Sequence, residues 1–407
     1  MKIVERVARV DQSKCVGCKN CERHCPTDAI KVTPGVMPGY VPPCGTACPA
    51  GTDVQGYIAL AGAGRYEDAY RLIRQSNPFP SVCGRICNHP CQAACNRNDL
   101  DESVGIRDIK RFVADKAFEN GMPVVEKKRK SNGKKIAVIG AGPSGLSCAY
   151  YLQLSGYSVE VFESESVAGG VLAYGIPEYR LPKAVLNRDI QAIEATGVQI
   201  HLNTTVGEDV SFDELYKKFH AVYVSTGTQL SRKANIPGED MPGVYHGLDF
   251  LKAVNLGKPV EIGKKVAVIG GGNTAIDAAR TARRLGAEVT IVYRRQRNDM
   301  PCEERELLEA FEEGVRVLDL AAPVEVVGEG KVQGLKCVRM VPGVKDEKLR
   351  RSTTKTEEEF VVEVDNIIVA VSQYSDFPFI NKDEVVVSKA GRIVLDEKGM
   401  KIGRAHV

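Results

Sequence analysis

The chain of 407 residues contains no tryptophan, and aromatic residues make up only 6% of it. It also has no apolar run that approaches the ~20 residues of a membrane helix. A formal charge of +3 at pH 7 is too small to indicate a strongly charged partner, such as a nucleic acid or a membrane surface. Residues 1–10 alternate charged and apolar side chains and lack the apolar core of a secretory signal peptide. We therefore expect a cytoplasmic protein whose partners include no nucleic acid and no membrane.

Cysteine, in contrast, is abundant: the chain has 13, and ten of them lie between Cys15 and Cys95. In a chain without an export signal, this density argues against disulfides and for metal or redox chemistry. The other three, Cys148, Cys302 and Cys337, have no partner at a ligand-like spacing, and we expect ordinary packed or surface thiols. The length allows about two to four domains, and 43% hydrophobic residues are enough for buried cores.

The first cysteines have C-x2-C-x2-C-x3-C-P spacing: Cys15, Cys18, Cys21 and Cys25. This run is typical of bacterial ferredoxins, in which it wraps a [4Fe-4S] cluster. A zinc site is the alternative, but zinc ribbons pair two separated C-x2-C knuckles, so the third cysteine favours iron and sulfur. The fourth ligand stays open, because the cysteine before proline serves the other cluster in two-cluster ferredoxins. We predict a ferredoxin-like [4Fe-4S] segment over residues 1–38.

A second cysteine group follows a proline- and glycine-rich connector. Its members are Cys44, Cys48, Cys83, Cys87, Cys91 and Cys95. Apolar residues at helical spacing predict helices over 58–73, which end at the Asn-Pro-Phe-Pro of 77–80, and a further helix over 104–115. The last four cysteines would line one helical face, but Gly84 and Pro90 favour ligation from a loop. We predict a helical iron–sulfur domain over 39–125, with structural zinc as the alternative, and a charged linker over 126–133.

A strand, a glycine turn and a helix are predicted where the apolar run 136–139 ends in G-x-G-x-x-G. Gly140 permits the turn, Gly142 lets a pyrophosphate approach the backbone, and Gly145 lets the helix pack on the strand. A second strand, 159–162, ends at Glu163, about 20 residues on, where an acid accepts the ribose hydroxyls of an adenine dinucleotide. The pattern predicts a dinucleotide site.

A second unit of the same kind begins with the strand and glycine turn of residues 265–277. Its next strand, 288–292, is followed by Arg294 and Arg295 instead of an acid. Because arginine pairs with a 2′-phosphate that an acid would repel, we predict NADPH over NADH. The alternative is that one arginine merely caps a loop. Further strands are expected at 324–327, 335–340 and 360–364.

Residues 39–400 resemble the small subunit of bacterial glutamate synthase and its relatives. The resemblance rests on Cys44-x3-Cys48-Pro, the Asn-Pro-Phe-Pro-Ser-Val-Cys-Gly-Arg-Ile-Cys of 77–87, the Gly140 turn, residues 169–183 and Gly270-Gly-Gly-Asn-Thr-Ala-Ile-Asp277. It implies an α/β and α fold: a ferredoxin-like segment, a helical iron–sulfur domain and two nested Rossmann-type domains for FAD and NADPH. The expected ranges are 134–250 for the first FAD part, 251–364 for the NADPH domain and 365–400 for the return to the FAD domain.

The resemblance also implies the site residues. Those expected to bind the dinucleotides are Gly140, Gly142, Pro143, Ser144, Gly145, Glu163, Gly169, Gly170, Leu172, Tyr174, Arg180, Thr226, Gly227, Gly270, Gly271, Gly272, Asn273, Thr274, Asp277, Arg294 and Arg295. All ten clustered cysteines are candidate metal ligands. No catalytic acid or base is expected, because hydride transfer needs none from the protein.

One departure from the family concerns the clusters. Relatives with two clusters in the helical domain carry an extra C-x2-C where this chain has Tyr-Val-Pro-Pro at 40–43. The family pattern gives one cluster Cys48, Cys87 and Cys91, and assigns Cys44 and Cys95 to the other. In one branch a side chain near Lys110 supplies that other cluster's fourth ligand, a place that lysine cannot fill. We expect two [4Fe-4S] clusters with two spare thiols. Cys44 or Cys95 completes the cluster of Cys48, Cys87 and Cys91, the ferredoxin-like segment replaces the lost cluster, and the pairing stays open.

The expected function is an oxidoreductase that moves electrons between NADPH, FAD and [4Fe-4S] clusters, and on to a partner subunit or a ferredoxin within a hetero-oligomer. The direction of flow stays open. One alternative is a subunit of a ferredoxin:NADP or electron-bifurcating reductase, which the ferredoxin-like segment favours. Another is a non-catalytic electron-transfer or scaffold subunit.

The last residues, 401–407, are expected to be an artefact. In one frame, residues 402–407 translate the common short-read adapter AGATCGGAAGAGCACACGTC, and its leading AG completes a lysine codon at position 401. We expect the genuine sequence to end near Met400, with a natural C-terminus as the alternative. The family's Gly-Asp turn and flavin-contacting helix are missing after 365–400, so the flavin domain is expected to be incomplete.

Overall fold

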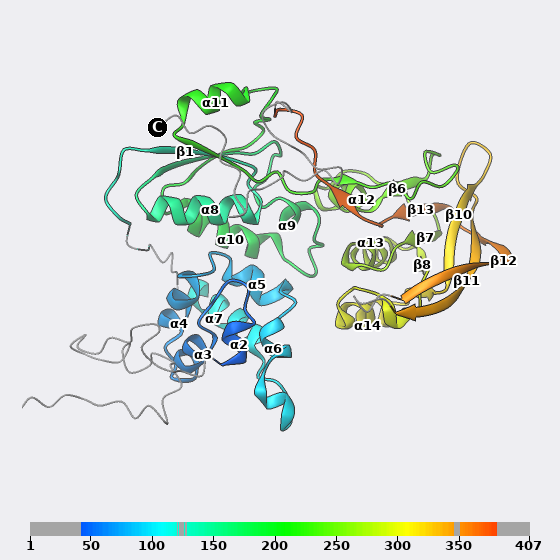
Figure 1. Ribbon diagram of the computed structural model, residues 1–407, viewed down its shortest axis with the longest axis horizontal. Coiled ribbons are helices and arrows are strands. Elements are labelled where there is room, and N and C mark those ends of the chain that lie inside the picture. Colours follow the sequence, from blue (N-terminus) through cyan, green and yellow to red (C-terminus); the bar gives the residue numbers. More distant parts are fainter. Residues whose placement is uncertain (1–41, 120, 122–125, 127, 346–350, 381–407) are drawn as a thin grey trace, which may run out of the picture. The chain divides into compact units, whose positions relative to one another are not determined.

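The computed structural model describes residues 42–119, 121, 126, 128–345 and 351–380. The predicted ferredoxin-like segment, with Cys15, Cys18, Cys21 and Cys25, and the predicted artefact at 401–407 lie outside these residues. The described chain forms two compact units (Figure 1). Unit 1 contains the residues up to Lys130 together with 150–156 and 183–198, and unit 2 contains the rest. In the described part, no helix has both the length and the apolar character needed to cross a membrane.

Unit 1 is helical. Its helices are α2 (Pro43–Thr46), α3 (Val54–Gly62), α4 (Tyr66–Arg74), α5 (Pro80–Ile86), α6 (Pro90–Ala93), the 3-10 helix η1 (Asn96–Asp99), α7 (Ile106–Glu119) and α10 (Lys183–Glu194). The side chain of Asp53 caps α3 by accepting from the N–H of Gly56 at 2.8 Å. Apolar side chains at helical spacing, including Tyr57, Ile73 and Val113, form its core. The predicted helices over 58–73 and 104–115 are confirmed.

The segment that carries the last four cysteines differs from the predicted loop. Cys83 lies within α5 and Cys91 within α6, and only Cys87 and Cys95 lie outside helices. The loop prediction is wrong because prolines open both helices, at a position where the missing N–H costs no hydrogen bond. Gly84 does not break α5 either. A Cβ there would stand 2.7 Å from Cα of Arg111, so this glycine allows α5 to pack closely on α7.

The first sheet of unit 2 is parallel, in the order β3-β2-β1-β4. Its strands are β1 (Lys135–Ile139), β2 (Ser158–Phe162), β3 (Gln199–His201) and β4 (Ala221–Val224), and the helices near them are α8 (Pro143–Leu154), α9 (Val171–Tyr174) and α11 (Phe212–Lys218). Val138 pairs with Val161 on one side and Tyr223 on the other. The predicted strands at 136–139 and 159–162, and the helix after the glycine turn, are confirmed.

A second parallel sheet has the order β6-β13-β7-β8-β9. Its strands are β6 (Val244–His246), β7 (Lys265–Ile269), β8 (Glu288–Val292), β9 (Arg316–Leu318) and β13 (Asn366–Val369), accompanied by α12 (Gly247–Asn255), α13 (Asn273–Arg284), η2 (Arg297–Asp299) and α14 (Glu304–Glu312). Small residues of α13, such as Ala275 and Ala279, pack on Val268 of the sheet. Because β6 and β13 belong to this sheet, it extends beyond both ends of the range 251–364.

The other strands of unit 2 are antiparallel. They are β10 (Ala321–Val327), β11 (Gly334–Lys345) and β12 (Arg351–Glu363) in one sheet, and β5 (Leu230–Ser231) paired with β14 (Gln373–Tyr374). Strands were predicted at 324–327, 335–340 and 360–364, and each is longer than predicted. After β14 the chain reaches the first sheet, where Phe379 packs beside Phe212, with ring centroids 5.9 Å apart.

Candidate functional site

The first glycine turn joins β1 to α8. Gly140 has φ +99°, and a Cβ there would stand 2.6 Å from the carbonyl oxygen of Ser225. A Cβ at Gly145 would collide with the carbonyl oxygen of Gly140, so the start of α8 lies directly against the turn. At Gly142 a Cβ would meet no atom within 4 Å. The turn is therefore tight on its protein side and open at Gly142, the arrangement that an approaching pyrophosphate requires.

Glu163 follows β2 beside this turn and is 3% exposed. Its carboxylate accepts two backbone hydrogen bonds, from the N–H of Ala141 at 2.7 Å and from the N–H of Glu165 at 2.9 Å. These donors stabilise a charge that burial alone would penalise. Because a carboxylate has about four lone-pair sites, Glu163 retains acceptor capacity for a ribose hydroxyl.

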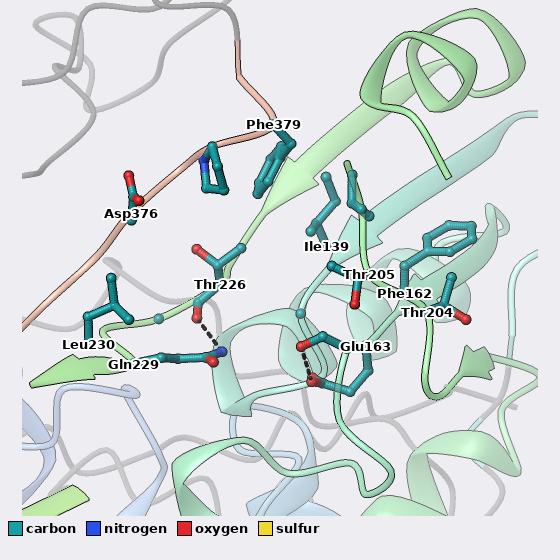
Figure 2. Close-up of a pocket in the computed structure, with 15 residues that line it drawn as sticks. Ile139, Phe162, Glu163, Thr204, Thr205, Thr226, Gln229, Leu230, Asp376 and Phe379 are labelled. Carbon is teal, nitrogen blue, oxygen red and sulfur yellow. Dashed lines mark hydrogen bonds between the residues drawn. The ribbon is translucent and has the colours of Figure 1, made fainter. Parts of the chain in front are cut away.

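A cavity of about 290 Å³ lies at the carboxyl edge of the first sheet (Figure 2). Gly140, Glu163, Thr226 and Gly227 line it. The hydroxyl of Thr226 is buried there without a hydrogen-bond partner in the described structure. The Glu163 carboxylate also accepts from the Ser164 hydroxyl at 3.4 Å, which leaves about one of its four acceptor sites. An unsatisfied hydroxyl in the same cavity as a carboxylate with an acceptor site left fits a polar ligand such as the adenosine part of FAD.

Several residues of this cavity were not predicted from the sequence: Thr204, Thr205, Gln229, Asp376 and Phe379. Thr204 and Thr205 follow β3, so the signal that would have identified them is their place after a parallel strand. Asp376 and Phe379 come from the far end of the described chain. No local pattern connects them to a cavity at the first sheet.

The segment after Glu163 turns through two glycines. Gly169 has φ +116° and Gly170 has φ +57°, and a Cβ at Gly170 would stand 3.0 Å from Cα of Gly142. This turn leads into α9, which buries Leu172 and Tyr174. The ammonium of Lys252 lies 5.1 Å from the centroid of the Tyr174 ring. Burial raises the pKa of the Tyr174 phenol, and the charges of Glu163 and Glu165 raise it further.

The second glycine turn joins β7 to α13. Gly270 has φ +139°, and a Cβ at Gly271 would stand 2.6 Å from the Tyr293 ring, whereas Gly272 faces open space. The side chains that follow have protein partners. Asn273 accepts from the N–H of Glu303 at 2.8 Å, and the Thr274 hydroxyl lies 3.4 Å from the amide nitrogen of Gln373. In this turn, a ligand therefore finds open space beside Gly272, whereas the side chains of Asn273 and Thr274 already contact other protein groups.

The two arginines after β8 differ in their contacts. Arg294 is exposed, and none of the hydrogen bonds or ion pairs found among the described residues includes it. Arg295 is half-buried, and its Nε donates to the carbonyl oxygen of Arg351 at 2.7 Å. Arg294 is therefore the arginine whose guanidinium is free for a phosphate.

Arg180 and Asp277, both predicted to bind a cofactor, contact each other. Nη1 of Arg180 donates to both oxygens of Asp277, at 2.9 and 2.8 Å, and its Nε lies 2.9 Å from Oε1 of Glu306. Arg280 pairs with Glu306 at 2.6 Å and with Glu313 at 2.7 Å. Burial raises the pKa of Asp277 to about 6, although Arg180 opposes this rise. The five groups form a largely buried ionic network.

Several thiols of unit 1 influence one another's pKa. The pKa of Cys91 is raised by burial, and the charges of Cys87 and Cys48 add to the rise. The pKa of Cys44 is likewise raised by burial, with a contribution from Cys95. The charges of Cys44, Cys48, Cys87 and Cys91 all act on the Tyr57 phenol, so these four thiols lie in one region of unit 1, and the grouping that the resemblance implies stays a prediction.

Cys83 differs from these thiols. Burial raises its pKa, and its sulfur lies 3.8 Å from the amide oxygen of Asn77. Within the described residues, no group of three or more His, Cys, Asp or Glu side chains is arranged to hold a metal ion. A [4Fe-4S] cluster takes one thiolate on each iron and is therefore wider than one ion. The donor set of unit 1, six cysteines with several thiols grouped, fits iron–sulfur chemistry.

Three family models match the chain. Residues 134–404 match pyridine nucleotide-disulphide oxidoreductase, residues 37–122 match dihydropyrimidine dehydrogenase domain II, 4Fe-4S cluster, and residues 8–31 match 4Fe-4S binding domain. These matches confirm the predicted fold class and the prediction of an oxidoreductase with FAD, NADPH and [4Fe-4S] cofactors.

Two curated relatives are similar over most of the chain. The NADPH-Fe(3+) oxidoreductase subunit beta of Geobacter sulfurreducens is 43% identical over 351 residues, 84% of this chain and 52% of the relative. The glutamate synthase [NADPH] small chain of Escherichia coli is 38% identical over 374 residues, 88% of this chain and 79% of the relative. The chain spans about half the length of the first of these relatives.

Among solved structures, Mycobacterium tuberculosis FprA in complex with NADPH has a TM-score of 0.56 at 22% identity, covering 65% of this chain and 76% of that one. At this identity the likeness concerns the fold alone. The sequence relatives carry the assignment further. The chain belongs to the pyridine nucleotide-disulphide oxidoreductase family and, within it, to the group that contains the glutamate synthase small chain.

Proposed function

We propose that this chain moves electrons between NADPH and [4Fe-4S] clusters by way of FAD, and exchanges them with a partner subunit or a ferredoxin. The observation that carries the proposal is the contrast between the two glycine turns. A buried carboxylate, Glu163, lies beside the first, and an exposed guanidinium, Arg294, lies beside the second. When bound, FAD supplies the conversion between the two-electron chemistry of NADPH and the single electrons that clusters carry.

In this proposal, the first sheet and the segment that returns to it after β14 hold FAD; they lie within the predicted ranges 134–250 and 365–400, of which β6 and β13 belong to the second sheet. The turn at Gly140 and the first amides of α8 bind its pyrophosphate, because helix N-termini favour anions. Glu163 and Thr226 orient its ribose end. The remaining residues proposed for this site are Gly142, Pro143, Ser144, Gly145, Gly169, Gly170, Leu172, Tyr174 and Gly227.

Residues 251–364 hold NADPH in this proposal. The open space at Gly272 admits the pyrophosphate, and Arg294 pairs with the 2′-phosphate. The other residues proposed are Gly270, Gly271, Asn273, Thr274 and Arg295. Arg180 and Asp277 act indirectly, because their side chains are 11% and 6% exposed and paired. We propose that their ion pair holds the segment around Arg180 against α13, the helix that follows the second glycine turn.

The thiols of unit 1 are proposed to hold one cluster and the cysteines of residues 1–38 another. Cys48, Cys87 and Cys91 supply three ligands in unit 1, and Cys44 or Cys95 supplies the fourth. One relative is named a subunit beta and the other a small chain, which supports a hetero-oligomer for this chain too. The thiol content supports a reducing, cytoplasmic location.

A second candidate is a subunit of a ferredoxin:NADP or electron-bifurcating reductase. The 4Fe-4S binding domain match at residues 8–31 favours it, because this segment adds a one-electron carrier before the helical unit. The two candidates differ in the electron acceptor and use the same NADPH and FAD sites.

The test is anaerobic titration of the purified, flavin-loaded protein with NADPH and with NADH, followed by the loss of flavin absorbance. We expect Arg294→Gln to weaken NADPH binding about 10- to 100-fold, because a hydrogen bond to a charged group contributes about 1.5–3 kcal/mol. NADH binding should be unchanged. Arg297→Gln is the matched control, because Arg297 is exposed nearby and its guanidinium lies 4.3 Å from the Phe311 ring centroid.

Two outcomes would contradict the proposal. If NADPH leaves the absorbance of the bound flavin unchanged, the non-catalytic alternative replaces the enzyme. If Arg294→Gln weakens NADPH and NADH equally, this arginine does not read the 2′-phosphate, and only the coenzyme preference fails.

A further inference from the structure

Lys110 is a buried cation for which the described part of the chain provides no carboxylate partner. It lies in α7 and is 7% exposed. Lysine is almost never buried unless its charge is paired. Among the described residues, no carboxylate lies within ion-pair distance of Lys110, and its ammonium is instead 5.6 Å from the centroid of the Tyr57 ring. Both partners are buried, and such a ring contact contributes about 2 kcal/mol, which is less than the several kcal/mol that burial of an unpaired ion costs.

The charge of Lys110 acts on three thiols of unit 1. Burial has the largest effect on the pKa of Cys48, Cys83 and Cys91 and raises it, whereas the charge of Lys110 lowers it. The net shift of the pKa is upward at Cys83 and Cys91 and downward at Cys48. Packing independently places Lys110 near these thiols. Cys91 belongs to the same buried cluster as Tyr57 and the α7 residue Val113, and α5 packs closely on α7 where Gly84, next to Cys83, meets Arg111.

A [4Fe-4S] cluster ligated by thiolates is an anion, and each added electron makes it more negative. A buried anion needs a counter-charge, and a buried cation needs one as well. We propose that Lys110 is the internal counter-charge of the cluster held by the unit 1 thiols, and that it raises the reduction potential of this cluster. The inference rests on the proposed function, since it requires that these thiols bind a cluster.

The direction follows from the charge. A fixed positive charge nearby stabilises the reduced cluster, which carries one more negative charge, more than it stabilises the oxidised cluster. Net charge and hydrogen bonding near the sulfurs are among the factors that set cluster potentials. Lys110 is thus assigned a positioning and tuning role, and not that of a ligand.

Arg111 provides a matched control. It is the next residue of α7 and has the same charge, but its side chain is 56% exposed and lies 3.8 Å from Asp115. Solvent and this partner screen its field. A charge lost at position 111 should therefore leave the cluster potential unchanged, whereas a charge lost at 110 should not.

The experiment is a redox titration of the full chain, purified anaerobically, with each reduced cluster followed by electron paramagnetic resonance. Iron and acid-labile sulfide are measured in every variant. We expect K110M, which keeps an apolar stem, to lower the midpoint of one cluster signal. At a fixed potential the ratio of reduced to oxidised cluster should fall at least tenfold, which for a one-electron couple is 59 mV. K110R should stay near the wild type, and so should R111M.

The outcomes separate this inference from the proposed function. If the wild-type protein keeps no iron and sulfide beyond one cluster, and its unit 1 thiols remain free to alkylation, the proposed cluster in unit 1 fails. Suppose instead that K110M keeps its full content of iron and sulfide. If the ratio of reduced to oxidised cluster at a fixed potential then changes less than threefold for every cluster, the counter-charge role fails and the proposed function stands. Loss of the cluster from K110M with retention in K110R supports the role, and equal loss from both overturns it.

Discussion

We expect the buried carboxyl group of Asp189 to make the stability of unit 1 depend on pH. Asp189 lies in α10, is fully buried, and accepts three hydrogen bonds from the start of α5. Oδ2 accepts from the N–H groups of Ser81 and Val82 at 3.0 and 3.1 Å, and Oδ1 accepts from the Ser81 hydroxyl at 2.8 Å. Asp189 thereby holds the N-terminus of the helix that carries Cys83 and ends before Cys87.

The pKa of Asp189 is raised from 3.8 to about 7, mainly by burial and against these hydrogen bonds. Between these two values the folded protein keeps a proton that the unfolded chain has released. The free energy of unfolding therefore falls as the pH rises through this window and levels off above about pH 7. At 1.36 kcal/mol per unit, the fall from about pH 5 to pH 8 amounts to about 3 kcal/mol for this group alone.

The substitution D189N tests the argument. The amide oxygen can accept from the same two N–H groups and the amide nitrogen can donate to the Ser81 hydroxyl, but the side chain cannot ionise. We expect the free energy of unfolding of D189N not to fall with pH. Relative to their difference at pH 5, the variant should therefore be more stable than the wild type by about 3 kcal/mol at pH 8. D189L removes every acceptor and leaves three donors buried, each costing about 1–3 kcal/mol, so it should be destabilised at every pH.

The assay is urea unfolding followed by far-ultraviolet circular dichroism, at several pH values between about 5 and 8. D99N is the control, because Asp99 is an exposed aspartate of the same unit, in η1. Its profile should follow that of the wild type. If D189N and the wild type differ by a constant amount across the range, the hydrogen bonds from α5 offset burial completely and the pKa of Asp189 is not raised.

Two further predictions concern unit 2. We expect Gly145→Ala to lower the amount of flavin bound per chain, measured by absorbance, because the added methyl group collides with the carbonyl oxygen of Gly140. Gly62→Ala is the control, because no atom lies near a Cβ at that position, and it should leave the bound flavin unchanged. Equal flavin content in the two variants would refute the close-packing argument. We expect R180M to lower unfolding stability by about 3–5 kcal/mol, because it leaves Asp277 and Glu306 buried without Arg180. The double substitution with D277N should recover part of this loss in urea titrations, and simple additivity of the two effects would contradict the pairing.

The sequence predicted the parts of the fold that local patterns determine. The strands next to Gly140 and Gly270 are four- or five-residue apolar runs that end at glycines, and both lie where expected. The placement of Cys83 and Cys91 in helices was not predicted, because proline was interpreted as a breaker where it starts a helix. Pairing across long separations has no local pattern at all, which is why the partnership of Asp189 with Ser81, and the action of Lys110 on three thiols, emerged only from the structure.

The two glycine turns show how one backbone design provides two different sites. Each turn has its own positive-φ glycine after a buried strand and each is followed by a helix, so the backbone alone does not distinguish FAD from NADPH. The residue after the next strand does. Glu163 turns inward, because the amides of Ala141 and Glu165 compensate its buried charge, and it offers acceptors to neutral hydroxyls. Arg294 is exposed to solvent, so its guanidinium pays no cost of burial and is available to a phosphate. Glu163 is the first residue after β2, and Arg294 is the second after β8. In the proposed function, the side chain at this place separates an acceptor site for ribose from a cationic site for a phosphorylated ribose.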